Sequence, residues 1–146
     1  MNYIKLQQDL LKDFLKEKIK RCMFFEEDGY VHILPDGIVV YRIPKCCWLL
    51  DGEWIKKNFP SSLTLKKLYN ENDCRPAVAT GAYKKNDDRT LMVIENEHFT
   101  VYIDKVFMKY FKDPTFMVKN NVSPVGVYEG KELVGVVCPA KVKVKE

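Results

Sequence analysis

Apolar and polar positions along the chain repeat with two periods, one helical and one extended, and these periods predict the elements. Over Asn2–Cys22 apolar residues recur mainly every three or four positions, the spacing that gives a helix one apolar face. These residues are Ile4, Leu11, Phe14, Leu15, Ile19 and Cys22. Basic residues occupy much of the remaining surface, so we expect an N-terminal amphipathic helix with a basic outer face. The acidic run Glu26–Asp28, followed by Gly29, predicts a loop.

A hairpin is predicted next. Two runs rich in β-branched and aromatic residues, Tyr30–Leu34 and Ile38–Ile43, flank the turn residues Pro35–Gly37. Large apolar side chains then crowd Pro44–Leu50, which predicts a short buried helix. A second helix is expected over Glu53–Phe59.

The middle of the chain changes to the two-residue period of β-strands. Strands are predicted over Ala77–Tyr83, Thr90–Glu95 and His98–Ile103, joined by polar turns. Before them, the pattern of Leu63–Tyr69 fits a strand and a helix equally well.

Asp104 is placed to cap a helix over Lys105–Phe111, because its carboxylate can accept from free N–H groups of a first turn. We expect this helix to point four apolar side chains inward: Val106, Phe107, Tyr110 and Phe111. Three further runs, Phe116–Lys119, Pro124–Tyr128 and Leu133–Val137, predict an antiparallel meander.

The length of 146 residues and the hydrophobic share of 47% fit one globular domain that buries its own core. The elements assign it to the α+β class, with antiparallel sheets and short packed helices behind the N-terminal helix. Within a single domain, 1–146, we place that helix at 1–22, a first half at 30–95 and a second half at 98–146. The net charge of +4 is compatible with weak attraction to nucleic acid and does not require it.

Five cysteines, two of them adjacent at Cys46 and Cys47, form no CxxC pair. This spacing fits neither a disulfide framework nor a zinc site, and it indicates reduced thiols in an intracellular protein. The first residues lack the apolar block of a signal peptide, and no run approaches the ~20 apolar residues of a membrane span. We therefore expect a cytoplasmic protein with no membrane contact, no metal and no cofactor.

No group of residues has the spacing of a catalytic site. His32 and His98 have no cysteine or acid at ligand spacing, so ordinary strand positions are favoured over metal ligation or general-base work. Cys46 and Cys47 begin a predicted helix, where the pKa of a thiol can fall, but burial beside Trp48 is favoured. An enzyme is therefore not expected.

Two segments resemble each other when aligned with a one-residue gap: Val40–Leu50 and Val101–Phe111. In each, a strand rich in β-branched residues and Tyr runs into a helix through a helix-starting residue and a lysine. This likeness predicts a β-α-β-β-β unit used twice. A chance likeness between two ordinary strand-to-helix junctions is the alternative.

The second half carries a family resemblance. A helix opens near Asp104, Ser123-Pro124-Val125 lies in a later strand, and a last strand runs through Gly135–Val137 into the tail Cys138–Val142. This order resembles the end of bacterial-type sliding DNA clamps, the processivity rings of replicative polymerases, whose tail reads Val-Val-Met-Pro-Met-Arg-Leu. Clamp domains each carry two β-α-β-β-β units, so the resemblance implies a clamp-like fold.

The sequence also departs from the clamp pattern. A clamp subunit has three domains, whereas this chain has room for one, and Cys138 and Ala140 stand where the clamp tail has Met. Ring closure would require a homo-oligomer. The resemblance implies a solitary clamp-like domain, encoded by a phage or mobile element, that binds a protein of replication, repair or host defence such as a CRISPR nuclease.

Three hypotheses about function follow. The first and favoured one is a non-enzymatic binding protein that uses a strand edge or its tail, with Val137, Cys138, Pro139, Ala140, Lys141 and Val142 as partner-binding residues. Lysines that alternate with valines as far as Lys145 would extend that edge. The second is a nucleic-acid binder using Lys12, Lys16, Lys20, Arg21, Lys56, Lys57, Lys66 and Lys67. The third is a small enzyme with His98 or Cys46 in its site.

Overall fold

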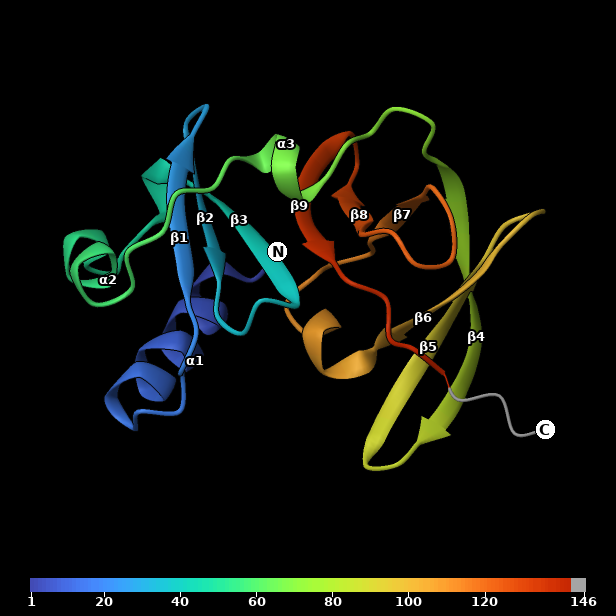
Figure 1. Cartoon of the computed structure of the whole chain (residues 1–146), viewed down its shortest axis with the longest axis horizontal. Helices are drawn as coiled ribbons and strands as arrows, with labels where there is room; N and C mark the ends of the chain where they lie inside the picture. Colours follow the sequence, from blue (N-terminus) through green and yellow to red (C-terminus); the bar gives the residue numbers. More distant parts are fainter. Residues whose placement is uncertain (143–146) are drawn as a thin grey trace.

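A computed structural model describes residues 1–142 of the chain. In this part nine strands form one antiparallel sheet in the order β1-β2-β3-β9-β8-β7-β4-β5-β6. The sheet consists of three meanders, with β7–β9 between the other two (Figure 1). The strands are β1 (Met23–Glu27), β2 (Tyr30–Leu34), β3 (Val39–Pro44), β4 (Arg75–Asn86), β5 (Arg89–Glu95), β6 (Thr100–Asp104), β7 (Thr115–Val118), β8 (Val125–Glu129) and β9 (Glu132–Val137). The predicted α+β class is confirmed.

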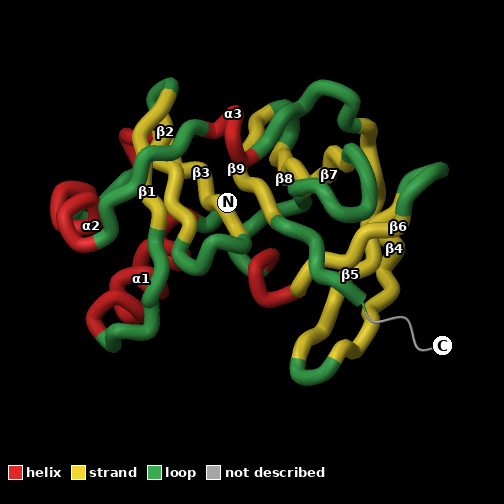
Figure 2. Tube along the Cα trace, viewed as in Figure 1, coloured by secondary structure: helices red, strands yellow, loops and turns green. Residues whose placement is uncertain are grey.

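Three α-helices and two 3-10 turns accompany the sheet within the described residues (Figure 2). They are α1 (Tyr3–Leu15), α2 (Gly52–Asn58), α3 (Leu65–Leu68), η1 (Lys45–Cys47) and η2 (Lys105–Met108). Asn2, Asp51 and Asp104 cap α1, α2 and η2, because each side chain accepts from a backbone N–H of the first turn. The N-terminal helix and the Asp104 cap are confirmed.

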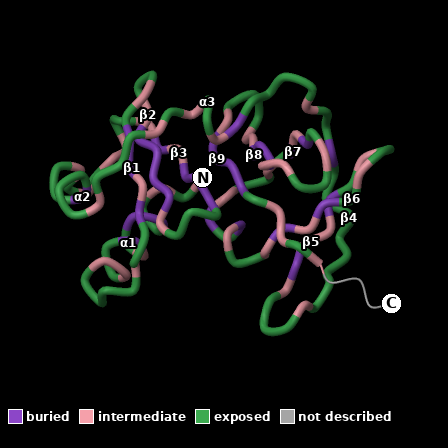
Figure 3. Tube along the Cα trace, in the orientation of Figure 1, coloured by how far each residue is buried: buried purple, intermediate pink, exposed green. Residues whose placement is uncertain are grey.

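Buried residues run along the strands, as Figure 3 shows, and they form two clusters, one on each face of the sheet. On one face, α1 and α2 bring Leu6, Leu10 and Ile55 into a large cluster that also contains residues of all nine described strands. On the other face, α3 and its flanking segment cover a smaller cluster: Phe25, Leu34, Val40, Tyr69 and Val136. The alternation of neighbouring residues such as Phe24 and Phe25 between the two clusters follows the two-residue period of a strand.

A buried polar side chain joins α1 to the segment after β3. Gln7 is almost fully buried and donates from Nε2 to the carbonyls of Tyr3 at 3.0 Å and Cys47 at 2.9 Å. The backbone N–H of Leu49 donates to its Oε1 at 2.6 Å. Both N–H groups of the amide and one lone pair of its oxygen are therefore used, which offsets the cost of burying it.

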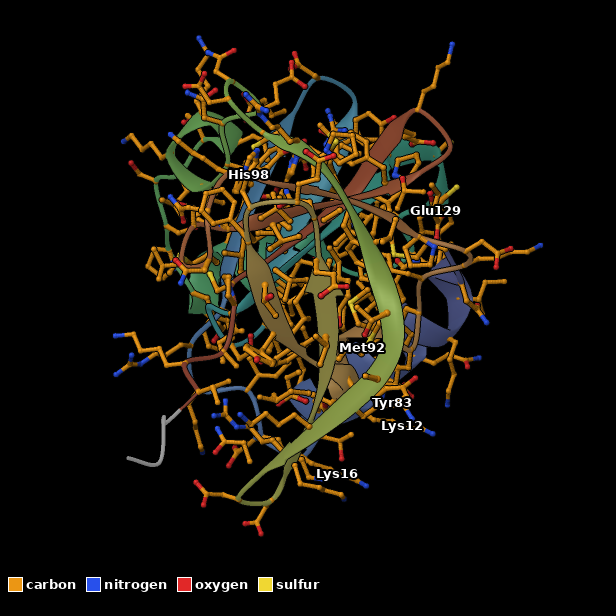
Figure 4. All side chains as sticks on the ribbon, turned by 90° about the vertical axis from the view of Figure 1, so that its right-hand side faces the viewer. Lys12, Lys16, Tyr83, Met92, His98 and Glu129 are labelled. Atoms are coloured by element: carbon orange, nitrogen blue, oxygen red, sulfur yellow. The ribbon has the colours of Figure 1, made fainter. Side chains whose placement is uncertain are left out.

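The sheet bends at β4. This strand pairs with β7 only over residues 75–77 and with β5 from Val78 onward. Its register shifts between Ala79 and Tyr83, where Gly81 has φ of +80° and Thr80 Oγ1 accepts from the N–H of Ala82. Such a bulge turns a strand out of the plane of its neighbours. In Figure 4 β4 lies nearest the viewer, with Tyr83 beside its partner Met92.

Several local predictions are confirmed. The Tyr30–Ile43 hairpin is β2 and β3, and the predicted meander is β7, β8 and β9. The helix expected over Glu53–Phe59 is α2, one residue earlier at each end. Leu65–Leu68 within the ambiguous segment is helical. The strand predicted over Ala77–Tyr83 is longer, because pairing with β5 continues to Asn86.

Two predictions for the first thirty residues are wrong. The helix expected to reach Cys22 ends at Leu15, because Glu17 adopts a left-handed conformation with φ of +55°. The loop expected over Glu26–Asp28 is largely strand, since β1 continues to Glu27 in register with β2. Glu26 lies within 3.2 Å of Lys45 and 3.7 Å of Lys56, so its charge is paired at the surface.

The two predicted short helices are also shorter than expected. In place of a buried helix over Pro44–Leu50 the chain forms only the 3-10 turn η1, which has no buried residue. The helix expected over Lys105–Phe111 is reduced to η2, and Val106 is 54% exposed rather than directed inward. His98 precedes β6 instead of beginning it, because Asn96 Oδ1 accepts from the N–H of His98 and turns the chain there.

Candidate binding surfaces

An apolar hollow of about 260 Å³ lies between α1 and α2. We call it the helical groove, and it is lined by Leu11, Phe14, Leu15, Leu50, Asp51, Trp54 and Ile55. Leu15 is 76% exposed, Leu11 47% and Trp54 45%. Large apolar side chains gathered at an exposed hollow are typical of interaction sites.

The groove arises because α1 carries apolar residues on two faces. Leu6 and Leu10, four positions apart, are buried against the sheet. Ile4, Leu11 and Leu15 are spaced by seven and four positions, so they form a second stripe, and all three are exposed. Phe14 lies between the faces and meets Trp54 edge to face at 5.5 Å between ring centroids.

Lysines flank this apolar stripe on α1. Lys12 and Lys16 each follow a stripe residue by one position, about 100° around the helix. Neither has an ion-pair partner among the residues described here. Asp9 lies on the side of these lysines that faces away from the groove. A hydrogen bond from Tyr110 is the main reason that the pKa of Asp9 is below its ordinary value. Lys12 and Lys16 thus place positive charge between the groove and the carboxylates of Asp9 and Asp13, which line a hollow with them.

The eight predicted nucleic-acid residues fall on separate elements. Lys12, Lys16, Lys20 and Arg21 lie on α1 and the segment after it, Lys56 and Lys57 on α2, and Lys66 and Lys67 on α3. Lys56 is within 4 Å of both Glu26 and Glu53, so its charge is largely compensated. A hollow beside Lys12 and Lys16 is also lined by Asp9 and Asp13. The eight residues therefore do not make one continuous basic face.

A different lysine completes a basic hollow at α3. Lys66 and Lys67 meet Lys119, from the end of β7, around a hollow of about 190 Å³. Its remaining lining residues are Leu68, Tyr69, Asn70, Ser123 and Pro124, so no carboxylate lines it. We call it the lysine hollow. Sequence reasoning missed Lys119 because it is more than fifty positions away from α3; the Ser-Pro of the clamp resemblance was the only signal near it.

The lysine hollow adjoins a larger groove of about 680 Å³, which we call the tyrosine groove. The two share Lys66, Tyr69 and Asn70. The tyrosine groove is further lined by Glu27, Asp28, Tyr30, Arg42, Leu65, Glu71, Asn72, Tyr128, Lys131, Glu132 and Leu133. Within it the hydroxyls of Tyr69 and Tyr128 are 3.1 Å apart, and burial raises the pKa of Tyr69 far above its ordinary value.

His32 lies beneath this groove and is fully buried. Its ring stacks on Phe25 at 4.4 Å, and Arg42 Nε donates to its Nε2 at 3.0 Å. Burial first, and the positive charge of Arg42 second, lower the pKa of His32 to about 4. The imidazole is therefore neutral near pH 7 and serves as an acceptor that holds Arg42 against the Tyr30 ring, 3.8 Å from its centroid.

Comparison with family models, with curated proteins and with solved structures finds no match for this chain. The clamp likeness rests on the sequence motifs alone.

The predicted tail residues are bonded across the molecule. Val137 is fully buried in β9, whereas Cys138 and Lys141 are exposed. The N–H of Cys138 donates to the Ile38 carbonyl at 2.9 Å, and that of Ala140 to the Tyr102 carbonyl at 2.8 Å. Partner binding by this tail stays a prediction. Lys143, Val144 and Lys145 lie outside the described residues.

The residues named for an enzyme are dispersed. Cys46 is exposed on η1 with its Sγ 3.8 Å from that of Cys47, and His98 is exposed before β6. His98 lies far from Lys12 and Lys16 in Figure 4. Across residues 1–142, no three His, Cys, Asp or Glu side chains gather as metal ligands. Within the same range, no helix has the length and apolar character to cross a membrane.

Proposed function

We propose that this chain is a non-enzymatic binding protein that engages another protein through the helical groove. The clamp resemblance supports a partner in replication, repair or host defence, and a phage or mobile-element origin. A clamp-like duplicated unit belongs to the same proposal. It is supported by the two matched segments, which both run from a strand into a 3-10 turn, at β3 to η1 and at β6 to η2.

The observation that carries the proposal is the second apolar stripe of α1. An amphipathic helix needs one apolar face to pack on its own sheet, and Leu6 and Leu10 supply it here. Ile4, Leu11 and Leu15 add apolar area that this packing does not use, next to the partly exposed Trp54. Tryptophan in a hollow is the residue type that most often dominates binding energy at protein interfaces.

The charge beside the stripe indicates the chemistry of the partner. Lys12 and Lys16 border the apolar residues without carboxylate partners among residues 1–142. An amphipathic helix of the partner, with an apolar face and flanking Asp or Glu, would bury the stripe and pair these lysines. A cytoplasmic location is part of the proposal and is supported by the free state of the five cysteines.

The test compares capture of proteins from a host lysate by the wild-type chain and by Leu15→Glu and Leu11→Glu. Val122→Glu is the matched control, because Val122 is a similarly exposed apolar residue, at 68%, in the β7–β8 loop. The proposal expects a protein that the wild type and the control retain and that both groove variants lose. Its purified form should then bind with an affinity at least about tenfold lower for Leu15→Glu. Equal retention by all four proteins would overturn the groove as the binding surface.

A further inference from the structure

We infer that the lysine hollow, formed by Lys66, Lys67 and Lys119 with Ser123 and Asn70, is a phosphate-binding site. The inference goes beyond the proposed function, because it concerns another surface and another class of ligand. It starts from a contrast between two lysine-lined hollows of this chain. The hollow at α1 contains Asp9 and Asp13, which would repel an anion, whereas the hollow at α3 contains no carboxylate.

The lysines of the hollow are available to a ligand. None of Lys66, Lys67 and Lys119 takes part in an ion pair within residues 1–142, and all three are exposed. Three lysines line a space of about 190 Å³, and their charges create a local positive potential that a compact anion can neutralise. Ser123 adds a hydroxyl donor and Asn70 an amide donor at the same place.

The backbone that carries these donors is fixed before any ligand binds. On one side, α3 is held by a hydrogen bond of 2.9 Å from the N–H of Leu65 to Glu27 and by the contact of Tyr69 with Tyr128. On the other side, Asn120 Oδ1 accepts from the N–H of Val122 at 2.9 Å and of Ser123 at 2.6 Å. Preorganised donors lower the entropic cost of binding.

The adjoining tyrosine groove bears on what the phosphate can be attached to. It shares Tyr69 and Asn70 with the hollow and has a volume of about 680 Å³, with the rings of Tyr128 and Tyr30 in its lining. Carboxylates also line this groove, against the positive charges of Arg42, Lys66 and Lys131, and they belong to Glu27, Asp28, Glu71 and Glu132. The phosphate itself is therefore placed in the lysine hollow, and only an uncharged part of the ligand, such as a base, in the groove. The shared chemistry is a phosphate group, either of a small phosphate or of a single-stranded chain, and the two sources are separable by experiment.

The experiment titrates two probes at low salt: pyrophosphate, followed by NMR shifts of the Lys119 and Ser123 amides, and a fluorescent single-stranded DNA of about twelve thymidines. Lys66→Glu and Lys119→Glu should weaken binding about tenfold each, and Ser123→Ala more mildly. Lys12→Glu and Lys16→Glu make the same change of charge on α1 and should change the affinity less than about twofold. Binding that involves all three lysines gives a salt slope of about −2 for a single strand.

The outcomes separate cleanly. Pyrophosphate binding alone, lost in the Lys66 and Lys119 variants, supports the site with a small phosphate as ligand, and DNA binding lost in the same variants supports a nucleic acid. The absence of both, or an equal loss in the α1 controls, overturns the inference. The altered lysine side chains are exposed, and circular dichroism verifies that the variants fold. Lys119→Gln removes the lysine charge without adding a carboxylate, so it should weaken binding as well. Failure here would leave the helical groove untouched, since that surface is formed by α1 and α2.

Discussion

Glu17 ends α1 in a conformation that suits glycine better than glutamate. Its φ is +55°, the N–H of Glu17 donates to the Phe14 carbonyl at 3.1 Å, and the N–H of Lys18 donates to the Asp13 carbonyl at 2.9 Å. This is the Schellman pattern of a helix C-terminus, in which glycine is the usual residue at the left-handed position.

We therefore predict that Glu17→Gly raises the free energy of unfolding by about 0.5–1 kcal/mol, because glycine removes the steric cost of the left-handed backbone. Urea unfolding followed by circular dichroism measures it. Lys16→Gly is the matched control, since Lys16 has φ of −88° and gains nothing from glycine. That variant should lose stability. An equal effect of the two substitutions would contradict the prediction.

His32 makes stability depend on pH in a defined window. Its ordinary pKa of 6.5 falls to about 4 in the fold, so below pH 6.5 the unfolded chain binds a proton that the folded chain does not. Stability is therefore expected to fall as the pH drops from about 6.5 to 4, by about 3 kcal/mol at most. His32→Gln, which keeps an acceptor for Arg42, should remove most of that slope in urea unfolding curves.

His98→Gln is the matched control for this prediction, because it makes the same replacement at an exposed histidine and leaves the His32 site intact. Asp9 does not account for this slope, because its pKa is lowered from 3.8. The stability that its carboxylate provides is therefore lost at lower pH than the histidine window. An unchanged slope in His32→Gln would show that another group titrates there.

These two residues also show where sequence reasoning stops. The apolar period continues past Leu15 to Ile19 and Cys22, and no Gly or Pro marks the end of the helix, so the stop at Glu17 could not be predicted. His32 was correctly placed in a strand. Its burial, however, depends on Phe25 of β1, and no strand was predicted there. Local pattern gives the element, and partners distant in the sequence decide the environment.

At the scale of elements, α3 depends on a glycine in the strand beneath it. A Cβ added at Gly126 would lie 2.6 Å from Tyr69 Cζ and 3.0 Å from Tyr128 Cε2. Gly126 therefore allows Tyr69 to lie directly on β8, and this contact holds α3 over the second hydrophobic cluster.

We predict that Gly126→Ala destabilises the protein by about 1–3 kcal/mol, since the methyl group displaces Tyr69. In a Tyr69→Leu background the same substitution should cost less, and a double-mutant cycle by urea unfolding measures the difference. Gly135→Ala is the control: its added methyl meets Phe111 and the Val40 carbonyl instead, so it should add to Tyr69→Leu without coupling. Additivity at Gly126 would refute the dependence of α3 on this glycine.

The apolar pattern of Leu63–Tyr69 did not distinguish a helix from a strand, and the reason is physical. A single helical turn contributes too few apolar positions to establish a period, and its stability comes from Glu27 and Gly126, which lie far away in the sequence. The lysine hollow shares this origin. Lys66 and Lys67 were named from their charge, but only the docking of α3 brings them to Lys119.

At the scale of the whole molecule, most hairpins were predictable and their assembly was not. Turn signals such as Pro35–Gly37 placed hairpins between strands that are neighbours in the sequence, whereas β1 and its hairpin with β2 were missed. The sheet is completed by the pairings of β3 with β9 and of β4 with β7, which join residues far apart in the chain. The pattern within one strand carries no information on its long-range neighbour.

A further long-range contact links the segment after β9 to β6. β6 is the terminal strand of the sheet, and the segment after β9 reaches it through the bond from the Ala140 N–H to the Tyr102 carbonyl. Ala140→Pro removes that donor, so we expect the free energy of unfolding to fall by about 1 kcal/mol. Relative to the wild type, hydrogen exchange should become faster in β5 and β6, with less change in β1 and β2. Ala140→Gly keeps the N–H and should retain the protection of β6. If both variants exchanged alike, the terminal strand would owe nothing to this bond, and its stability would come from β5 and the core alone.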